Sequence, residues 1–479
     1  MESAVWSFSI LLILITAAGA FAWVRKRKTT GDYLVASREV KPWLSALSAV
    51  ATNNSGFMFI GMIAFSYRVG IESIWMAVGW ILGDLTAWLF VHPRVREHSG
   101  RMKAKTLSGV IGMSDGNENR VLIVLAGLIT FVFLGIYSAG QFKAGSLALH
   151  ALFGWDMWVG ILIAMVVVIL YSFAGGIRAT IWTDAAQSLV MIGSMAMILI
   201  MSWRTIGGPS ALFDNLRQQD PALMSLFPAN LEFGVLFYLL GMMSGGFGSM
   251  GQPQIMVRFM AIESVEAIKR ARVWYFTWFV PFFAASVGVG LYSRAILPDL
   301  PNLEVAEGVT EPTELALPLM TMEMLPEVFV GISLAGLFAA TMSTADSQVI
   351  VCSGSVTQDI RPKWKDSYIA SKVATVSVAL LALAVALFAP EGVFGLVLIA
   401  WSALAASLGS VMLLRIFRQP FSTTTAVVMM LTGFGTVVAW HLSAFNDDVF
   451  KLLPGLAAAF LVYLVSRLFA KFTSRGTHS

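Results

Sequence analysis

Long runs of apolar residues, separated by short polar segments, follow one another along the whole chain. A membrane-spanning helix needs roughly 20 mostly apolar residues, and thirteen runs meet this requirement. They leave no segment for a sizeable soluble domain, so the expected fold class is an all-α polytopic membrane protein. The expected helices, to within a few residues at each end, are 6–24, 42–70, 72–91, 119–149, 155–174, 181–204, 231–257, 271–296, 326–357, 368–389, 392–416, 422–442 and 449–470.

Charges in the connecting loops test this count, because cytoplasmic loops of membrane proteins are rich in Lys and Arg. Basic residues gather in alternate loops and the tail: Arg25, Lys26, Arg27, Lys28, Arg38 and Lys41; Arg94, Arg96, Arg101, Lys103 and Lys105; Lys269, Arg270 and Arg272; Arg361, Lys363 and Lys365; Lys471 and Arg475. The other loops hold one Arg among polar and acidic residues: Asp214, Arg217 and Asp220; Asp299, Glu304, Glu307, Glu311 and Glu314; Asn446, Asp447 and Asp448. An error of one helix in the count would place every later loop on the wrong side of the membrane and reverse the agreement with its charge. The alternation therefore supports an odd total, with the N-terminus outside and the C-terminus cytoplasmic.

The composition agrees with a chain that lies mostly in lipid. Only 13% of the 479 residues are charged and 57% are hydrophobic, whereas a soluble globular protein carries about 25% charged residues. The cytoplasmic loops explain the net charge of +4 without a nucleic-acid partner. The single cysteine, Cys352, excludes an intramolecular disulfide and a thiolate metal cluster. Glu2 precedes the first apolar run and basic residues follow it, which favours a retained helix over a signal peptide.

Two of the expected helices contain strings that oppose a continuous helix. The second contains residues 51–56, Ala-Thr-Asn-Asn-Ser-Gly, and the seventh contains residues 244–253, which include four glycines and Pro253. Glycine costs about 1 kcal/mol relative to alanine inside a helix, and proline about 3 kcal/mol. We therefore expect both helices to unwind, which would free backbone carbonyls to bind a cation. The alternative is that the glycines only permit close helix packing.

The two interrupted helices are five helices apart, which suggests an internal repeat. Because five is odd, a second copy of five helices would be inverted relative to the first, as in many secondary transporters. The expected segments are an N-terminal helix with a basic loop (1–41), the first repeat (42–204), an external loop (205–230), the inverted second repeat (231–417), and two C-terminal helices with a tail (418–479).

Several strings, in the same order, resemble the sodium/solute symporter family over nearly the whole chain, and its sodium/proline branch most closely. They are Ser55-Gly56; Gly175-Gly176 with Trp182-Thr183-Asp184; Gly251-Gln252-Pro253 with Val257-Arg258-Phe259-Met260; and Met342-Ser343-Thr344 with Cys352-Ser353. The resemblance implies a LeuT-like fold of two inverted five-helix repeats, with one extra helix at the N-terminus and two at the C-terminus.

The resemblance also implies a main sodium site between the second and ninth helices. Its ligands would be the carbonyls of Ala51, Asn54 and Ala340 and the hydroxyls of Ser343 and Thr344. Oxygen ligands suit a hard cation such as sodium, and Ala340, Ser343 and Thr344 share one helix face by their spacing. The alternative is that the two hydroxyls only bond back to carbonyls of their own helix.

A second sodium site, used by some members of the family, would involve Asp184, Ser343, Asp346 and Ser347. An acid within a membrane helix is costly and usually serves an ion or proton pathway, which favours a functional role for Asp346. Asp184 lies near a helix start, where a carboxylate also stabilises the helix dipole.

The proline pocket is not reproduced in this sequence. Asn53 stands where the proline branch has an aspartate, and Gly245 and Ser249 stand where it has aromatic residues. Loss of two rings predicts room for a larger or differently shaped solute. Tyr137 matches a substrate-facing tyrosine of the family, and Gln141 lies one turn further on the same face. The expected solute-binding residues are Asn53, Ser55, Gly56, Tyr137, Gln141, Lys143, Gly245, Ser249 and Met250.

Lys143 interrupts an apolar helix and has no counterpart that the resemblance assigns. One interpretation gives Lys143 a functional role: it binds a substrate carboxylate, pairs with an acid such as Asp84, or transfers a proton. The alternative, of equal weight, is that its side chain extends toward the outer surface, because it lies near that end of its helix.

We therefore expect a sodium-coupled symporter that imports a small organic solute, an amino acid or another carboxylate, by alternating access. Its partners would be the solute, Na⁺ as the coupling ion and the lipid bilayer, without nucleic acid or an organic cofactor. We expect a monomer or weak oligomer in a cell membrane, the inner membrane if the source is bacterial. The alternatives are proton coupling through Asp184, Asp346 or Lys143, and a symporter-like receptor, for which we see no output domain. An enzyme is not expected, because no nucleophile with a base and no metal-ligand cluster is evident.

Overall fold

The computed structural model describes residues 2–24, 29–305, 307–446 and 448–476, and nearly all regular structure in them is helical. The strands β1 (Met113–Ser114) and β2 (Asn117–Glu118) form a short antiparallel hairpin. The basic run at residues 25–28 and the acid Asp447, which contribute to the predicted topology, lie outside the described residues.

Helices of very different lengths follow one another along the chain. They are α1 (Glu2–Val24), α2 (Thr30–Val35), α3 (Pro42–Asn53), α4 (Gly56–Phe59), α5 (Gly61–Val69), α6 (Ile74–Phe90), α7 (His92–Arg101), α8 (Leu107–Gly112), α9 (Arg120–Phe153), α10 (Met157–Ile206), α11 (Pro209–Gln219), α12 (Gly234–Phe247), α13 (Pro253–Ala261), α14 (Val265–Ile296), α15 (Ala316–Met324), α16 (Glu327–Gly354), α17 (Tyr368–Phe388), α18 (Val393–Leu404), α19 (Ser410–Ile416), α20 (Thr423–His441) and α21 (Leu452–Gly476).

Both predicted helix breaks are confirmed. In the second expected helix, α3 ends at Asn53, and the Ser55 hydroxyl then caps α4 by accepting a hydrogen bond from the Phe57 N–H. In the seventh, a short 3₁₀ turn, η4 (Gly248–Gly251), separates α12 from α13. Pro253 begins α13, because the first turn of a helix leaves its N–H groups unbonded and a proline there loses no hydrogen bond.

Other boundaries differ from the predicted ones. The fifth and sixth expected helices form one long element, α10, which bends at Gly176, where φ is 58°. Glycine permits this left-handed backbone, so the chain changes direction without a loop. The eleventh expected helix contains a π-helical turn (Ala405–Gly409) between α18 and α19. Among the described residues, ten helices are long and apolar enough to cross a membrane, and 2–15 and 157–170 are shorter apolar helices. The total of thirteen stays a prediction.

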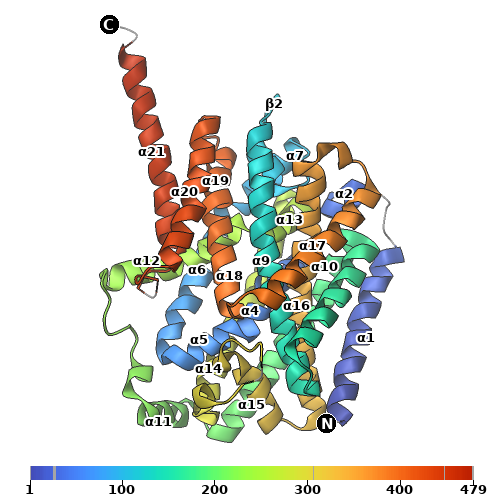
Figure 1. The fold of residues 1–479 in the computed structure, drawn as a ribbon, viewed down its shortest axis with the longest axis vertical. Coiled ribbons are helices and arrows are strands. Elements are labelled where there is room, and N and C mark those ends of the chain that lie inside the picture. Colours follow the sequence, from blue (N-terminus) through green and yellow to red (C-terminus); the bar gives the residue numbers. More distant parts are fainter. Residues whose placement is uncertain (1, 25–28, 306, 447, 477–479) are drawn as a thin grey trace.

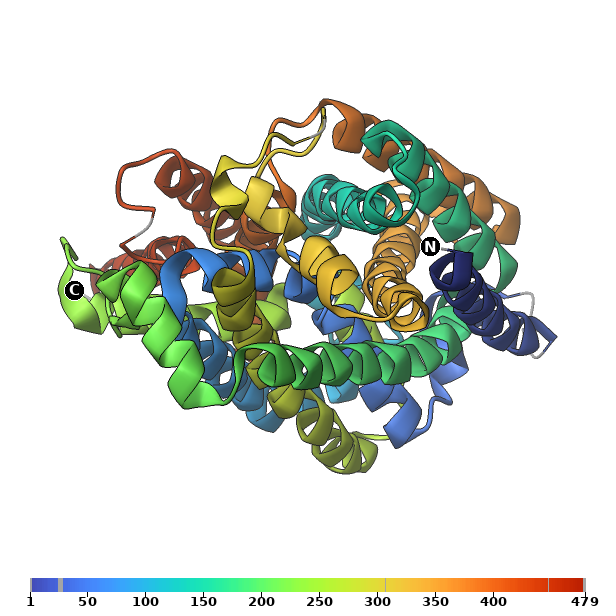
Figure 2. The ribbon, with the colours of Figure 1, turned by 90° about the horizontal axis from the view of Figure 1, so that it is seen from below.

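The elements around the two breaks form the centre of the molecule. α16 is buried along most of its length and packs against α9, α10 and α1. α1 lies at one side of the bundle, and α20 and α21 lie at the other (Figures 1 and 2). α1 begins at the lower end of the view in Figure 1 and α21 ends at the upper end, an arrangement that an odd number of crossings would produce.

Candidate functional site

Oxygen atoms from α3 and α16 meet beside the first helix break. The Ser343 hydroxyl lies 2.9 Å from the Ala340 carbonyl and 3.3 Å from the Ala51 carbonyl. The Thr344 hydroxyl lies 3.2 Å from the Ala340 carbonyl and 3.2 Å from the Thr52 carbonyl. A hydroxyl has only one proton, so each shares it between its own helix and the facing one. The two hydroxyls therefore bond back to their own helix and also link it to the broken helix, and their role as sodium ligands stays a prediction.

These oxygens form a donor set that suits sodium. Three carbonyls and two hydroxyls converge at a buried position, and a hard cation prefers such ligands. The Thr52 carbonyl was not among the predicted ligands, because the residue next to a helix break cannot be oriented from sequence. Asn54 was predicted, but among the contacts of the described residues none joins its carbonyl to this cluster. Its side-chain NH₂ instead donates to the Val50 carbonyl at 2.8 Å.

The residues predicted for a second sodium surround a buried arginine. Arg258 of α13 forms an ion pair of 2.9 Å with Asp184 of α10, and both side chains are fully buried. Arg258 also donates to the Ser347 hydroxyl, and Asp184 accepts a 2.5 Å hydrogen bond from Ser48. The guanidinium thus occupies the space between two of the predicted ligands. Sequence reasoning used Arg258 only as part of a motif, although a cation in an apolar helix already indicates a buried partner.

Asp346 completes this group of charges. Its carboxylate accepts hydrogen bonds from Thr180 at 3.2 Å and from Ser347 at 3.1 Å. It interacts electrostatically with both Asp184 and Arg258. Arg258 pairs directly with Asp184, and Asp346 lies near this pair in a buried region, where an unpaired charge is expensive. Ser343, which was predicted for both sites, joins the two groups: its hydroxyl lies in the first cluster, and its carbonyl accepts a 2.7 Å hydrogen bond from the Ser347 hydroxyl.

A small cavity lies beside the first break and contains two of the predicted solute residues, Asn53 and Tyr137. Its volume is about 10 Å³, room for about one water molecule. Most of the wall is aromatic and was not predicted: Phe57, Trp80, Phe279, Phe283 and Trp401 line it together with Asn54, Met58, Val397 and Leu398. Sequence reasoning missed these rings because aromatic residues in apolar helices give no signal of where they point.

Other predicted solute residues support the break itself. The Gln141 side-chain oxygen accepts a 2.9 Å hydrogen bond from the Gly56 N–H. The Ser55 and Tyr137 hydroxyls lie 3.4 Å apart. Gln141 therefore holds the start of α4 against α9. Ser249 and Met250 are buried on η4 and do not line the cavity.

The expected extra space at the seventh helix is filled, which corrects the sequence-based expectation. A side chain at Gly245 would overlap the ring of Trp80, and a side chain at Gly248 would overlap Trp401. The Trp401 indole N–H donates to the Gly245 carbonyl at 2.9 Å. Trp80 of α6 thus occupies the volume expected at Gly245, and Trp401 of α18 packs against the neighbouring Gly248 on η4.

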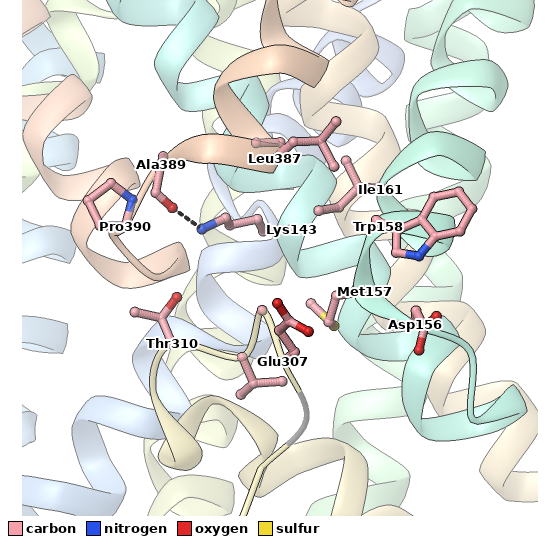
Figure 3. Close-up of a pocket in the computed structure, with 13 residues that line it drawn as sticks. Lys143, Asp156, Met157, Trp158, Ile161, Glu307, Thr310, Leu387, Ala389 and Pro390 are labelled. Atoms are coloured by element: carbon pink, nitrogen blue, oxygen red, sulfur yellow. Dashed lines mark hydrogen bonds between the residues drawn. The ribbon is translucent and has the colours of Figure 1, made fainter.

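Lys143 lies outside the aromatic cavity. Its ammonium donates to the Ala389 and Glu391 carbonyls at 2.7 and 2.9 Å, just beyond the end of α17. Figure 3 shows it at a separate cavity of about 530 Å³, with Glu307 and Asp156 on the other walls. A cation suits the carbonyls at a helix C-terminus. The structure therefore favours neither a pair with Asp84 nor contact with a solute in the aromatic cavity.

A third cavity leads toward the aromatic one. It has a volume of about 390 Å³ and includes Arg68, Glu72 and Lys451. Leu398 lines both cavities. Phe57 lines the aromatic cavity and stacks on Phe394, which lines this third cavity, called the outer cavity below; the ring centroids are 5.6 Å apart. Only a thin, largely aromatic partition thus separates the two spaces.

Comparison with known proteins agrees with the family that the sequence resembles. A model of the Sodium:solute symporter family matches residues 33–433. The high-affinity proline transporter PutP of Bacillus subtilis (strain 168) is 29% identical over 461 residues, which cover 94% of this chain and 95% of that protein. The sodium/proline symporter of Escherichia coli (strain K12) is 29% identical over 478 residues, covering 98% and 93%.

Solved structures share the fold. A substrate-bound, outward-open Na⁺-coupled sialic acid symporter matches with a TM-score of 0.76 at 20% sequence identity, covering 96% of both chains. Mhp1, a nucleobase-cation-symport-1 family transporter in a closed conformation, matches with a TM-score of 0.56 at 14% identity, covering 92% of this chain and 95% of that one. These likenesses confirm the expected all-α, LeuT-like fold.

Proposed function

Because the chain belongs to the sodium:solute symporter family, we propose that it imports a small organic solute together with sodium by alternating access. The membership confirms the resemblance seen in the sequence. The observation that carries the proposal is the cluster of oxygens between Ala51 and Thr52 on α3 and Ser343 and Thr344 on α16. It lies directly beside the break that borders the aromatic cavity.

Sodium would act by strengthening the link between α3 and α16, which hydroxyl–carbonyl hydrogen bonds of 3.2 and 3.3 Å join at this cluster. A cation at this cluster would replace hydroxyl–carbonyl contacts with ion–oxygen contacts and hold the broken helix against α16. The adjacent residues Asn53 and Asn54 would then keep a fixed position for the solute. One sodium ion moved through 100 mV provides about 2.3 kcal/mol, enough for roughly fifty-fold accumulation of the solute.

Solute would enter through the outer cavity. Opening requires the stacked rings of Phe57 and Phe394 to separate, because they stand between this cavity and the aromatic one. The relatives of this chain include proline transporters. The resemblance implies an aspartate at position 53 and aromatic residues at positions 245 and 249 in the proline branch. Asn53, Gly245 and Ser249 stand there in this chain, which supports a solute other than proline.

The pair of Arg258 and Asp184 supports one sodium ion per solute, since a fixed guanidinium already neutralises one of the two acids expected to hold a second ion. Asp346, the second of these acids, is not paired with a cation of its own in the described part of the chain. This favours a second candidate function, in which a proton is the coupling ion. Transport that follows a pH gradient without sodium would identify that alternative.

The setting of this function would be a cell membrane, the inner membrane if the source is bacterial, with the N-terminus outside and the C-terminus in the cytoplasm. The charge alternation of the loops supports this orientation. Small solutes, Na⁺ and lipid would be the partners of a monomer or weak oligomer.

Reconstitution into liposomes tests the proposal. Solutes that stabilise the purified protein more in sodium than in potassium are first selected by thermal shift, because a cotransported solute binds more tightly with its ion present. Their uptake is then measured under an inward sodium gradient or an inward proton gradient. Accumulation driven by sodium alone is expected. Accumulation that ignores sodium and follows the proton gradient would overturn the proposal.

A further inference from the structure

A buried acid on α6 lies behind the wall of the aromatic cavity. Asp84 is only 1% exposed, and one of its carboxylate oxygens has no hydrogen-bond partner in the described part of the chain. The side chains of Tyr275 and Ser249 approach it, and no Lys, Arg or His of the described residues pairs with it. A buried carboxylate without a counter-charge is costly. Such a group is a candidate for recognition of a positive ligand.

Asp84 is connected to the cavity through two side chains. The Asn53 NH₂ donates to the Tyr275 hydroxyl, which leaves the proton of that hydroxyl free to point toward the Asp84 carboxylate. In this arrangement the side-chain oxygen of Asn53, Oδ1, is turned away from Tyr275. It has no hydrogen-bond partner within the described ranges, and the same is true of the Asn54 side-chain oxygen. An ionised Asp84 thus fixes Asn53 with an unbonded side-chain oxygen, and Asn54 provides a second one, on residues that line the cavity.

The rest of the wall favours a positive group as well. Trp80 lies one helical turn before Asp84 on α6. The ring of Trp401 lies beside the ring of Trp80, with centroids 6.3 Å apart. Tryptophan faces attract cations. None of the described residues that line the cavity is basic. Lys143, the residue expected to bind a carboxylate, is held at the end of α17 beside another cavity.

We propose that the solute carries an ammonium group, which is recognised, once Phe57 and Phe394 separate and the cavity widens, by the Asn53 and Asn54 side-chain oxygens and the tryptophan rings, with Asp84 as the positioning residue behind them. The inference rests on the proposed function, whose solute class it narrows. Asp84 supplies a negative charge from α6, behind Asn53. It acts through Tyr275 and Asn53 and does not touch the solute.

Matched compounds test this assignment. Each set has one carbon skeleton with three head groups, for example cyclopentylamine, cyclopentanol and cyclopentanecarboxylate, and further sets use larger rings. Thermal stability of the purified full chain is measured in potassium phosphate with added sodium chloride or potassium chloride, so that no buffer amine competes. We expect the amines to stabilise the protein in sodium, and the alcohols and carboxylates to do so far less.

Variants separate recognition from folding. Asp84→Asn keeps the shape of the side chain and removes a buried charge, so the protein is expected to fold. It should bind amines about ten-fold more weakly, the scale of a hydrogen bond that depends on a charged group, and lose the preference for amine over alcohol. Lys143→Gln is the matched control and should retain that preference.

The outcomes are distinct. Tighter binding of carboxylates than of amines would overturn the ammonium assignment, and so would the absence of any sodium-dependent effect of the amines. A full amine preference in Asp84→Asn, or loss of that preference in Lys143→Gln, would overturn it as well. Stabilisation by sodium without solute is recorded in the same experiment. Its absence would count against sodium coupling itself, independently of which head group binds.

Discussion

The ring of Trp80 on α6 fills the space that a side chain at Gly245 on α12 would need. Gly245→Ala should therefore lower stability by about 1–3 kcal/mol, the usual cost of overpacking a filled core. Gly245→Ala should cost less in a Trp80→Leu protein than in the unchanged protein, because the smaller side chain makes room, although Trp80→Leu itself lowers stability. Thermal unfolding of both single variants and the double variant measures the coupling.

Gly193→Ala provides the control, because a side chain at that position of α10 meets nothing within 4 Å. It should leave the unfolding temperature unchanged or slightly raised. Purely additive effects of Gly245→Ala and Trp80→Leu would show that the two residues do not compete for the same space.

The ion pair between Arg258 and Asp184 predicts a large loss on removal of one partner. Arg258→Met leaves the buried Asp184 carboxylate without its cation and should destabilise the protein by about 3–5 kcal/mol. Adding Asp184→Asn should recover part of that loss. Arg217→Met removes a partner of the exposed pair with Asp214 and should change stability by less than about 0.5 kcal/mol. Equal effects of the two arginine substitutions on thermal stability would contradict the buried network.

Glu314 predicts a dependence of stability on pH. It lies in η6 (Pro312–Leu315), is buried, and accepts a 3.0 Å hydrogen bond from the Phe394 N–H at the start of α18. Burial raises the pKa of its carboxyl above the ordinary value. Folding therefore favours the protonated form, and the contribution of Glu314 to stability falls as pH rises through the unfolded-state pKa toward the higher folded-state value.

Glu314→Gln keeps an acceptor and removes this titration. The unfolding temperature of the variant, relative to the unchanged protein, should rise as the pH is raised from about 4 to 7. Circular dichroism melts at several pH values measure this difference. A difference that stays constant across the range would show that Glu314 keeps an ordinary pKa.

Local chemistry made the two helix breaks predictable. The glycines around Gly248, together with Pro253, oppose helix wherever they are placed, and the spacing of Ser343 and Thr344 puts both on one face of α16. These features depend only on neighbours in the sequence. The fold class followed because the apolar runs are long and frequent.

The remaining features depend on contacts between distant segments. Arg258 pairs with Asp184, 74 residues earlier in the chain, and Lys143 bonds to carbonyls 246 and 248 residues later. Neither partner can be chosen from the residue types alone. The same holds for Trp80, whose position turns a predicted space at Gly245 into a filled one.

Binding of radioactive sodium to the purified protein tests the sodium site most directly, because it does not require the solute to be known. Ser343→Ala and Thr344→Ala are compared with the unchanged protein and with Ser286→Ala, whose buried hydroxyl bonds only to the Phe282 carbonyl of its own helix among the described contacts. Saturable sodium binding is expected in the unchanged protein and in Ser286→Ala, and binding at least about ten-fold weaker in the other two. Unaltered sodium binding in both Ser343→Ala and Thr344→Ala would contradict the account.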